Sequence, residues 1–286
     1  MPTGCTRRPP PGEADQPSAR PYRLLAVKLA TFNAPGRDGP VAGQVLDGRV
    51  EAFEEGLRVV DVLAGEPVRA SGESWPLGEV SLLAPIPEPG TVFAIGLNYA
   101  KHVAETGNKA PQAPIVFVKV RASLAAPGGP IRCPEVVEKL DYEGELAIVI
   151  GAGGAIVGFC IADDVSARDL QGREPQWTRA KGADTFCPFG PWVTTTDEVP
   201  DGNDLRLRTW VNGELRQDSS TSDLIFDCQA LVDFISQTCT LQPGDLILTG
   251  TPSGVGMALD PPQFLSSGDR VRIAIEGLGE IEHFVE

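Results

Sequence analysis

Residues 139–150, KLDYEGELAIVI, place two glutamates, Glu143 and Glu145, at the start of a strongly apolar run. Alternate side chains of a β-strand point to the same face, so we expect these two carboxylates to lie side by side. Neighbouring like charges repel each other, and each perturbs the pKa of the other unless a cation lies between them. The pattern fits a pair of metal ligands or a strand with an acidic solvent face, and taken alone it favours the acidic solvent face.

The composition is that of a globular protein. Of the 286 residues, 42% are hydrophobic and 22% are charged, which is enough apolar material to bury a core. The 32 glycines and 26 prolines favour many short strands joined by turns. The formal net charge of −15 argues against nucleic acid or an anionic membrane surface as a partner. An anionic substrate would therefore need local cations or a metal ion to hold it.

The cysteines and the hydropathy pattern bear on location. The six cysteines form no CxxC pair and no zinc-ligand spacing, which is typical of reduced thiols in a cytoplasmic protein. The sequence has neither an apolar stretch of membrane-spanning length nor a signal-peptide core. We therefore expect a soluble cytoplasmic protein.

Composition divides the chain into four segments. Residues 1–20, rich in proline and polar side chains, predict a disordered tail. Residues 21–65 predict a small β-rich domain, with a strand starting at Tyr22 and closing with the strand-like LRVVDVL. Residues 66–90 contain five prolines and favour a linker, and residues 91–286 form the larger domain.

The larger domain contains more strand patterns than helix patterns. A hairpin signal lies at Asn212–Gly213, and a similar one at Asp47–Gly48 lies in the small domain. Residues 222–237 predict a helix with Ser222 as its N-cap, and 99–106 a shorter one. Because no regular βαβ alternation is present, we expect a mostly antiparallel or mixed β fold with a few helices. The expected strands lie at 91–98, 115–120, 145–151, 155–162, 205–211, 214–219, 245–252, 270–276 and 280–286.

A third carboxylate follows in ADDVSARDLQ (162–171). Asp164, Arg168 and Gln171 are spaced i, i+4 and i+7, and would share one face if a helix started there. Asp164 would then point to the same place as the two glutamates, with Arg168 and Gln171 facing a substrate. Three oxygen ligands without His or Cys suit Mg²⁺, Mn²⁺ or Ca²⁺ rather than zinc. The alternative is an ordinary Asp–Arg ion pair on a helix surface.

A possible acid–base pair lies in GLNYAKHVAETG (96–107). On a helix, Glu105 is close enough to His102 to hold one ring nitrogen, which leaves the other free to take a proton from water. The second histidine, His283, lies in a C-terminal strand without an obvious partner. A lone histidine is more often structural, so this pair by itself is a weak signal.

Six segments, in this order, resemble the fumarylacetoacetate hydrolase family, over about residues 90–286. They are GLNYAKHVAETG, LDYEGELAIVIG, DDVSARDLQ, QWTRAKGADTFCPFGPWV, VNGELRQDSSTSDLIF and PGDLILTGTPSGVG. The resemblance implies an α+β, mostly β fold: a mixed β-roll catalytic domain after a small β-rich N-terminal domain. It also implies a homodimer.

The resemblance also implies roles for individual residues. It makes His102 and Glu105 a water-activating dyad on a helix that closes over the substrate. Lys181 would contact the substrate near the metal, and Thr251 would lie where a glycine-rich turn approaches the ligand. The implied ligands of a divalent ion, Mg²⁺ or Mn²⁺ with Ca²⁺ as an alternative, are Glu143, Glu145 and Asp164; Arg168 and Gln171 would line the pocket.

Two features depart from the family pattern. The connection over 151–163 is shorter than usual, without the family's helical insertion, and Asp163 stands where the family often has Asn. Both lie close to the expected metal ligands, so they bear on the surroundings of the site rather than on the ligands.

The function that follows is a metal-dependent enzyme acting on a small anionic 2-oxo or 1,3-dicarbonyl acid. Hydrolysis of a C–C bond in an acylpyruvate-like or fumarylacetoacetate-like compound comes first, because a cation at the carbonyl oxygen stabilises the enolate that forms. Decarboxylation of oxaloacetate comes second. Isomerisation or hydration of a 2-oxo acid, hydrolysis of a sugar-derived diketo acid, a role in natural-product synthesis, and a family member that binds without catalysis remain open.

Overall fold

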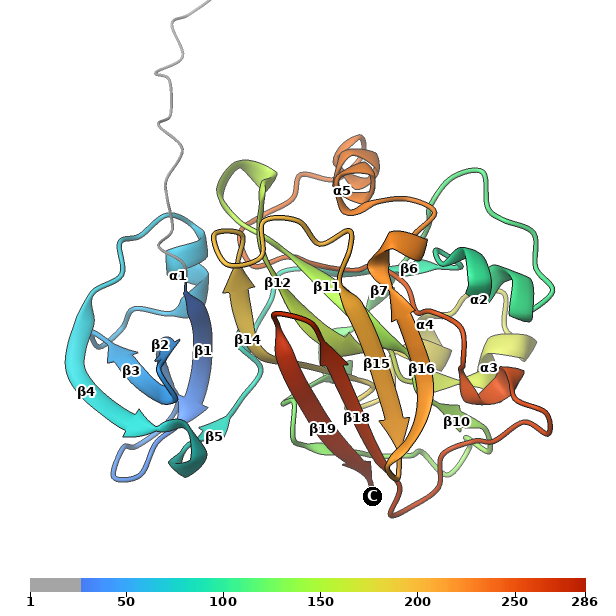
Figure 1. Ribbon diagram of the computed structural model, residues 1–286, viewed down its shortest axis with the longest axis horizontal. Coiled ribbons are helices and arrows are strands. Elements are labelled where there is room, and N and C mark those ends of the chain that lie inside the picture. Colours follow the sequence, from blue (N-terminus) through green and yellow to red (C-terminus); the bar gives the residue numbers. More distant parts are fainter. Residues whose placement is uncertain (1–26) are drawn as a thin grey trace, which may run out of the picture.

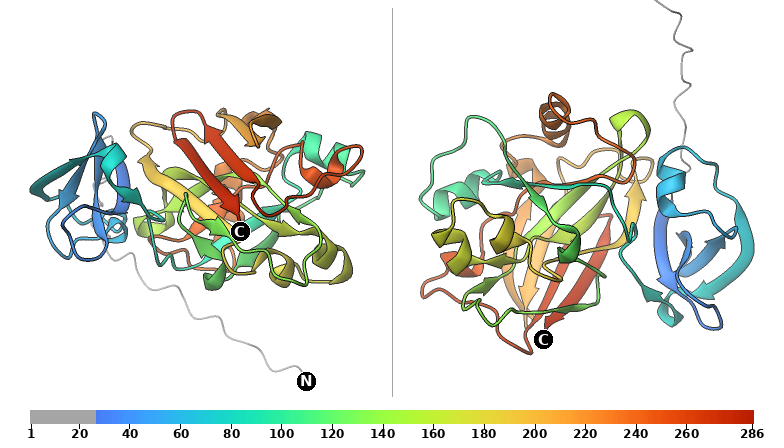
Figure 2. Two further views of the ribbon diagram at one scale, coloured as in Figure 1. Left: turned by 90° about the horizontal axis from the view of Figure 1, so that it is seen from below. Right: turned by 180° about the vertical axis from the view of Figure 1, so that it is seen from behind.

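The computed structural model describes residues 27–286, which form two β-rich units lying side by side (Figures 1 and 2). The expected disordered tail, 1–20, and the beginning of the strand expected from Tyr22 lie outside the described residues. The mostly β fold with mixed sheets and a few helices, predicted from the sequence, is confirmed.

The smaller unit, blue to cyan in Figure 1, is a meander of antiparallel strands. The predicted hairpin forms at Asp47 and Gly48, whose φ angles of 48° and 74° suit a two-residue turn. The strands, in the order in which they pair, are β4 (Ala70–Pro76), β3 (Arg49–Phe53), β2 (Val41–Leu46) and β1 (Lys28–Asn33).

The segment LRVVDVL is a helix, α1 (Val59–Leu63), and the expectation of a strand there is wrong. Val59, Val62 and Leu63 are buried, and their spacing of three and four residues is that of a helix face. The Asp61 carboxylate accepts a hydrogen bond from the backbone N–H of Arg58 at 2.9 Å, which caps the first turn.

The prediction of a linker over 66–90 is wrong for its central part. Strand β4 pairs with β3, and β5 (Ser81–Leu82) pairs with β1. Trp75 of β4 packs edge-on against Phe32, with ring centroids 6.0 Å apart. The prolines misled the prediction because Pro76 is the last residue of β4 and the later ones follow β5, so none interrupts a ladder.

One twelve-stranded sheet runs from the small unit into the large one. The bridge is β14 (Cys187–Thr195), which pairs with β1 on one side and with β12 (Ile156–Asp163) on the other. Short β8 (Leu124–Ala125) also pairs with β14. The sheet continues from β12 through β11 (Gly144–Ile150), β17 (Leu246–Leu248), β6 (Val92–Gly96) and β7 (Ile115–Lys119).

A five-stranded sheet packs against this one, and their facing side chains form the main core. Leu146, Ile148 and Ile150 of β11 share this core with Ile273 and Ile281. The alternate β11 residues face a second core on the other side of the large sheet, which explains why this strand reads as uniformly apolar. The second sheet contains β16 (Glu214–Ser220), β15 (Arg206–Val211), β18 (Arg270–Ile275), β19 (Gly279–Val285) and β9 (Pro130–Ile131); β10 (Leu140–Asp141) and β13 (Ser166–Ala167) form a separate pair.

The larger unit also contains several short helices. The predicted helix near the C-terminal third exists as α5 (Cys228–Ser236), but its N-cap is Asp227, whose carboxylate accepts from the N–H of Ala230 at 2.8 Å. The expected cap, Ser222, lies in a separate 3₁₀ turn, Thr221–Asp223. None of the helices in residues 27–286 is long and apolar enough to cross a membrane. The remaining helices are α2 (Ala100–Glu105), α3 (Arg168–Arg173) and α4 (Thr178–Lys181).

Candidate metal centre and active site

Three buried carboxylates, those of Glu143, Glu145 and Asp164, converge in the larger unit. One oxygen from each lies within 4.8 Å of the others. The pairing of β11 with β12 brings them together, because Gly144 is the register partner of Asp163 and the N–H of Asp164 donates to the carbonyl of Glu143 at 3.0 Å. The acidic cluster is therefore internal, and the alternative of an acidic solvent face does not apply.

Close packing explains why a glycine, Gly144, lies between the two glutamates. A β-carbon at Gly144 would overlap the hydroxyl of Thr209, which belongs to the five-stranded sheet. The hydroxyl of Thr251 donates to the carbonyl of Gly144 at 3.0 Å and fixes the same stretch from another loop. This contact positions the backbone that carries both glutamates.

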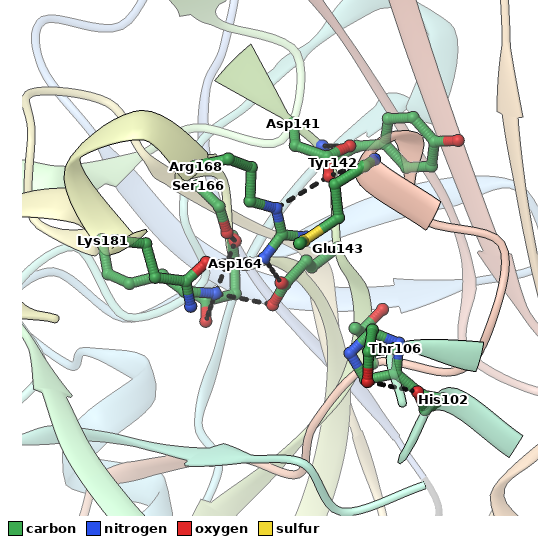
Figure 3. Close-up of polar contacts among 12 residues, drawn as sticks. His102, Thr106, Asp141, Tyr142, Glu143, Asp164, Ser166, Arg168 and Lys181 are labelled. Carbon is green, nitrogen blue, oxygen red and sulfur yellow. Dashed lines mark hydrogen bonds and ion pairs between the residues drawn. The ribbon is translucent and has the colours of Figure 1, made fainter. Parts of the chain in front are cut away.

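Cationic side chains contact Glu143 and Asp164, and two of them, Lys181 and Arg168, are drawn in Figure 3. The ammonium of Lys181 lies 2.6 Å from Glu143 Oε2 and 2.7 Å from Asp164 Oδ2. Arg168 Nη1 lies 2.6 Å from Glu143 Oε1. Burial alone would raise the pKa of Glu143, but the charges of Lys181 and Arg168 outweigh it and lower that pKa to about 2.

Glu145 differs from the other two carboxylates. Its contact is the backbone N–H of Gly250, which donates to Oε2 at 2.7 Å, and no ion pair from the described residues reaches it. Burial, together with the charges of Asp164 and Glu143, raises the pKa of Glu145 well above its ordinary value. Three converging oxygens, one of them without a cationic partner, form a donor set that fits a hard divalent cation.

Arg168 is fixed by a carboxylate that the sequence did not single out. Its Nε donates to Asp141 Oδ2 at 2.8 Å, and the N–H groups of Gly256 and Met257 donate to the same carboxylate at 2.8 and 3.1 Å. Arg168 Nη1 also donates to the amide oxygen of Gln171 at 2.9 Å. Asp164 is not on the helix with these two residues, because α3 begins at Arg168; the chain turns after β12 instead, and the expectation of one shared helix face is wrong.

The contact between His102 and Glu105 forms on α2, as the spacing predicts. His102 Nδ1 lies 2.8 Å from Glu105 Oε1, and the Glu105 carboxylate accepts from the N–H of Gly254 at 3.0 Å. These contacts fix the imidazole ring and leave Nε2 available. His102 is buried on the side of α2 that faces the acidic cluster's cavity (Figure 3).

A single cavity of about 380 Å³ contains most of the predicted site residues. Glu105 and Glu145 do not line it; Glu105 contacts the lining residue His102, and an oxygen of Glu145 lies within 4.8 Å of oxygens of Glu143 and Asp164. A second cavity of about 350 Å³ lies in the small unit, beside Phe53 and Ile86, and is separate from the acidic cluster. The predicted residues that line the first cavity are His102, Glu143, Asp164, Arg168, Gln171, Lys181 and Thr251.

Further buried charges around the site were not predicted. Lys119 Nζ lies 2.6 Å from Asp164 Oδ1 and donates to the carbonyl of Phe186 at 2.9 Å. The sequence signal that could have pointed to Lys119 is its position as the last residue of β7, an otherwise apolar strand. His283 also has a partner, contrary to expectation: its Nε2 lies 2.8 Å from Asp163 Oδ2, a contact between sequence-distant strands that no local pattern predicts.

Comparison with known proteins gives a consistent result. Residues 91–286 match the family model described as fumarylacetoacetate (FAA) hydrolase C-terminal. A mitochondrial oxaloacetate tautomerase of Xenopus laevis is 44% identical over 216 residues, which cover 71% of this chain and 68% of that protein. The oxaloacetate tautomerase YisK of Bacillus subtilis is 42% identical over 223 residues, covering 73% of this chain and 74% of its own length.

The fold is shared as well. The crystal structure of a 2-hydroxyhepta-2,4-diene-1,7-dioate isomerase from Mycobacterium marinum superposes with a TM-score of 0.77 at 39% identity. The match covers 91% of this chain and 98% of that one. With the family model matching more than half of the sequence, the chain belongs to the fumarylacetoacetate hydrolase family of enzymes.

Proposed function

We propose that the protein is a divalent-metal-dependent enzyme that interconverts the keto and enol forms of a small 2-oxo acid. The observation that carries this proposal is the shared cavity, where the free Nε2 of His102 faces the buried acidic cluster and Lys181. A proton acceptor and a source of positive charge that line one space are the two requirements for enolate chemistry.

Glu143, Glu145 and Asp164 would hold a divalent ion, Mg²⁺ or Mn²⁺, which would supply Lewis-acid stabilisation of the charge that develops on the substrate oxygen. The buried carboxylates of these residues are the donors that such a cation prefers.

The protein's own residues bind the acid and move its proton. The cationic groups of Lys181 and Arg168 attract the carboxylate and oxo group of the substrate, and Gln171 lines the same space. His102 Nε2 takes a proton from the carbon beside the carbonyl, and the electron pair moves onto the carbonyl oxygen. Transfer of that proton from His102 to the oxygen gives the enol, and the same steps in reverse regenerate the keto form. Glu105 holds the imidazole in the required tautomer and stabilises its charged form.

The names of the relatives support tautomerisation as the first candidate reaction. Two relatives at 42–44% identity are named oxaloacetate tautomerases, and a solved relative is named an isomerase. Tautomerisation needs the proton transfer alone, without a water nucleophile. It therefore replaces the C–C bond hydrolysis that the sequence placed first.

Hydrolysis of an acylpyruvate-like acid is kept as the second candidate. The observation in its favour is the His102–Glu105 contact at 2.8 Å, an arrangement that can also deprotonate a water molecule. The enolate released by C–C cleavage would use the same positive charges.

The experiment follows the enol absorbance of oxaloacetate and of acetylpyruvate, with Mg²⁺, with Mn²⁺ and with EDTA. Ketonisation without loss of carbon identifies a tautomerase, whereas release of acetate and pyruvate identifies a hydrolase. If neither compound reacts faster than its uncatalysed rate with either metal, the proposal is wrong. We also propose a homodimer, for which size-exclusion chromatography with light scattering should give twice the 30.3 kDa of one chain.

A further inference from the structure

The cavity has an apolar wall in addition to its charged floor. Leu97, Phe117 and Trp177, which we call the apolar wall, line the same space as Arg168 and Lys181. The charged floor consists of Arg168 and Lys181. The apolar wall begins next to it, because the ammonium of Lys181 lies 5.5 Å from the ring centroid of Phe117. A bound 2-oxo acid with its head on the floor therefore directs any further substituent along these side chains.

The aromatic part of the wall is built by three segments. Trp177, just before α4, meets Phe117 of β7 edge to face, with ring centroids 5.3 Å apart and the rings at 78°. Any β-carbon at Gly96 of β6 would overlap the indole ring, so the absence of a side chain at this position lets Trp177 lie on the strand. Such edge-to-face packing holds the two rings as a rigid surface.

Leu97 contributes through an uncommon backbone conformation. Its φ of 55° lies in the left-handed region, which is unfavourable for leucine. The next residue, Asn98, is fully buried, and its amide donates to the carbonyls of Phe226 and Thr249 at 3.0 and 2.8 Å. Its amide oxygen accepts from the N–H of Phe226 at 2.9 Å. These bonds hold a strained leucine at the cavity, and strain of this kind concentrates at ligand sites.

The distribution of charge gives the wall its selectivity. Among the described residues lining the cavity, the permanent cations are Arg168 and Lys181, and both already contact carboxylates of the acidic cluster. A second carboxylate on the substrate, lying along the wall, would lose hydration without gaining an ion pair. A hydrocarbon group in that place would gain from burial.

We propose that the apolar wall binds a hydrocarbon substituent beyond the oxo-acid head, so that the protein prefers 2-oxo acids with an uncharged tail over dioates of the same length, whose second carboxylate would lie on the wall. Oxaloacetate, whose two carboxylates both belong to the four-carbon head, is outside this comparison. This inference rests on the proposed function for the position of the oxo-acid head. It makes Leu97, Phe117 and Trp177 specificity-determining residues. The preferred substrate would then differ from that of the solved M. marinum relative, which is named for a dioate.

The test compares three acylpyruvates that share one head. Acetylpyruvate has no tail, isohexanoylpyruvate has an apolar tail, and succinylpyruvate has a carboxylate of the same shape as that tail. Loss of the enol absorbance reports both tautomerisation and cleavage. We expect kcat/KM to rise about fourfold for each tail CH₂ that becomes buried, or about 0.8 kcal/mol, and succinylpyruvate to fall to or below acetylpyruvate.

Variants connect the preference to the wall. Trp177→Ala should lower kcat/KM for isohexanoylpyruvate about tenfold more than it lowers kcat/KM for acetylpyruvate. Trp177→Phe, a milder change, should keep part of the preference if the alanine variant does not fold. The matched control is Trp210→Ala, because Trp210 lies on β15 against Arg208 and Arg272 and does not line the cavity.

Each contrary result has a distinct meaning. Equal kcat/KM for the two long substrates, or an equal loss on all three substrates in Trp177→Ala, would overturn the inference and leave the proposed function standing. Turnover of none of the three, with no turnover of oxaloacetate either, would overturn the proposed function. The tail preference would then be measured as binding, by calorimetry in Mg²⁺. Isohexanoylpyruvate must bind more tightly than succinylpyruvate for the inference to stand.

Discussion

His283 Nε2 lies 2.8 Å from Asp163 Oδ2, and both side chains are completely buried. The other carboxylate oxygen of Asp163 accepts from the backbone N–H of Glu143 at 2.7 Å. A histidine on β19 of the five-stranded sheet is thus connected, through one carboxylate, to the main chain of a candidate metal ligand on the other sheet. Partners of this kind orient the ligands that contact the ion.

Asp163→Ala should therefore weaken metal binding without removing a ligand. The change leaves the buried N–H of Glu143 without an acceptor, which costs about 1–3 kcal/mol of folding stability. Loss of an orienting partner lowers metal affinity by roughly 10–100-fold. Titration calorimetry with Mn²⁺ and thermal unfolding measure the two effects. The control is Asp163→Asn, which keeps an acceptor oxygen for Glu143; if both variants bind Mn²⁺ like the unchanged protein, the positioning role is refuted.

Lys119→Met should have a similar effect through Asp164. Lys119 is almost completely buried, and its ammonium contacts Asp164 Oδ1 and the carbonyl of Phe186. Methionine fills a similar volume but cannot hold the carboxylate in place, so we expect a fall in Mn²⁺ affinity of roughly tenfold or more. Lys109→Met, at an exposed position, is the control for loss of one positive charge. Equal Mn²⁺ affinity in Lys119→Met and Lys109→Met would show that Lys119 does not position Asp164 for the metal ion.

Local patterns in the sequence predicted most strands and the contact between His102 and Glu105. The alternation around Glu143 and Glu145 and the three-residue spacing of His102 and Glu105 are local features, and the geometry follows from strand and helix periodicity. The roles of these residues as ligands and acid–base groups stay predictions. The family resemblance, confirmed by the match over 91–286, contributed the proposed ligand set and the expectations for Lys181 and Thr251.

The parts that the sequence did not predict depend on distant contacts. Lys119, Asp141 and His283 meet their partners across 45, 27 and 120 residues, so no window of sequence contains both members. The segment LRVVDVL became a helix because a strand and a helix of this length share the same apolar composition. Tertiary packing decided between them.

His102→Ala should separate catalysis from binding. Removing the proton acceptor should lower kcat by roughly 10²–10⁴-fold for any keto–enol substrate, because general base catalysis contributes that much. Oxalate, which chelates a metal ion and has no proton to lose, should bind the variant in Mg²⁺ as tightly as it binds the unchanged protein. Tight oxalate binding with undiminished kcat would show that another group takes the proton.

Glu145→Gln should stabilise the metal-free protein, and increasingly so as the pH rises. Burial and the charges of Asp164 and Glu143 raise the pKa of Glu145 above the ordinary 4.5, so the folded state binds more protons than the unfolded state above that value. The free energy of unfolding therefore falls as pH rises from about 5, and glutamine, which carries no charge, removes this loss. The pKa of Glu143 is lowered to about 2, so its favourable contribution is lost only at more acidic pH and does not interfere.

Thermal unfolding in EDTA between about pH 5 and pH 8 measures the effect of this substitution. The melting temperature of Glu145→Gln minus that of the unchanged protein should be smallest at the acidic end and grow by a few degrees, at about 2–4 °C per kcal/mol. With saturating Mn²⁺ the order should reverse, since binding stabilises the unchanged protein by about 2.7 kcal/mol at a hundredfold excess over Kd and the variant lacks one ligand. A pH-independent difference would show that Glu145 is already charged without metal, and a variant stabilised by Mn²⁺ as strongly as the unchanged protein would remove Glu145 from the ligand set.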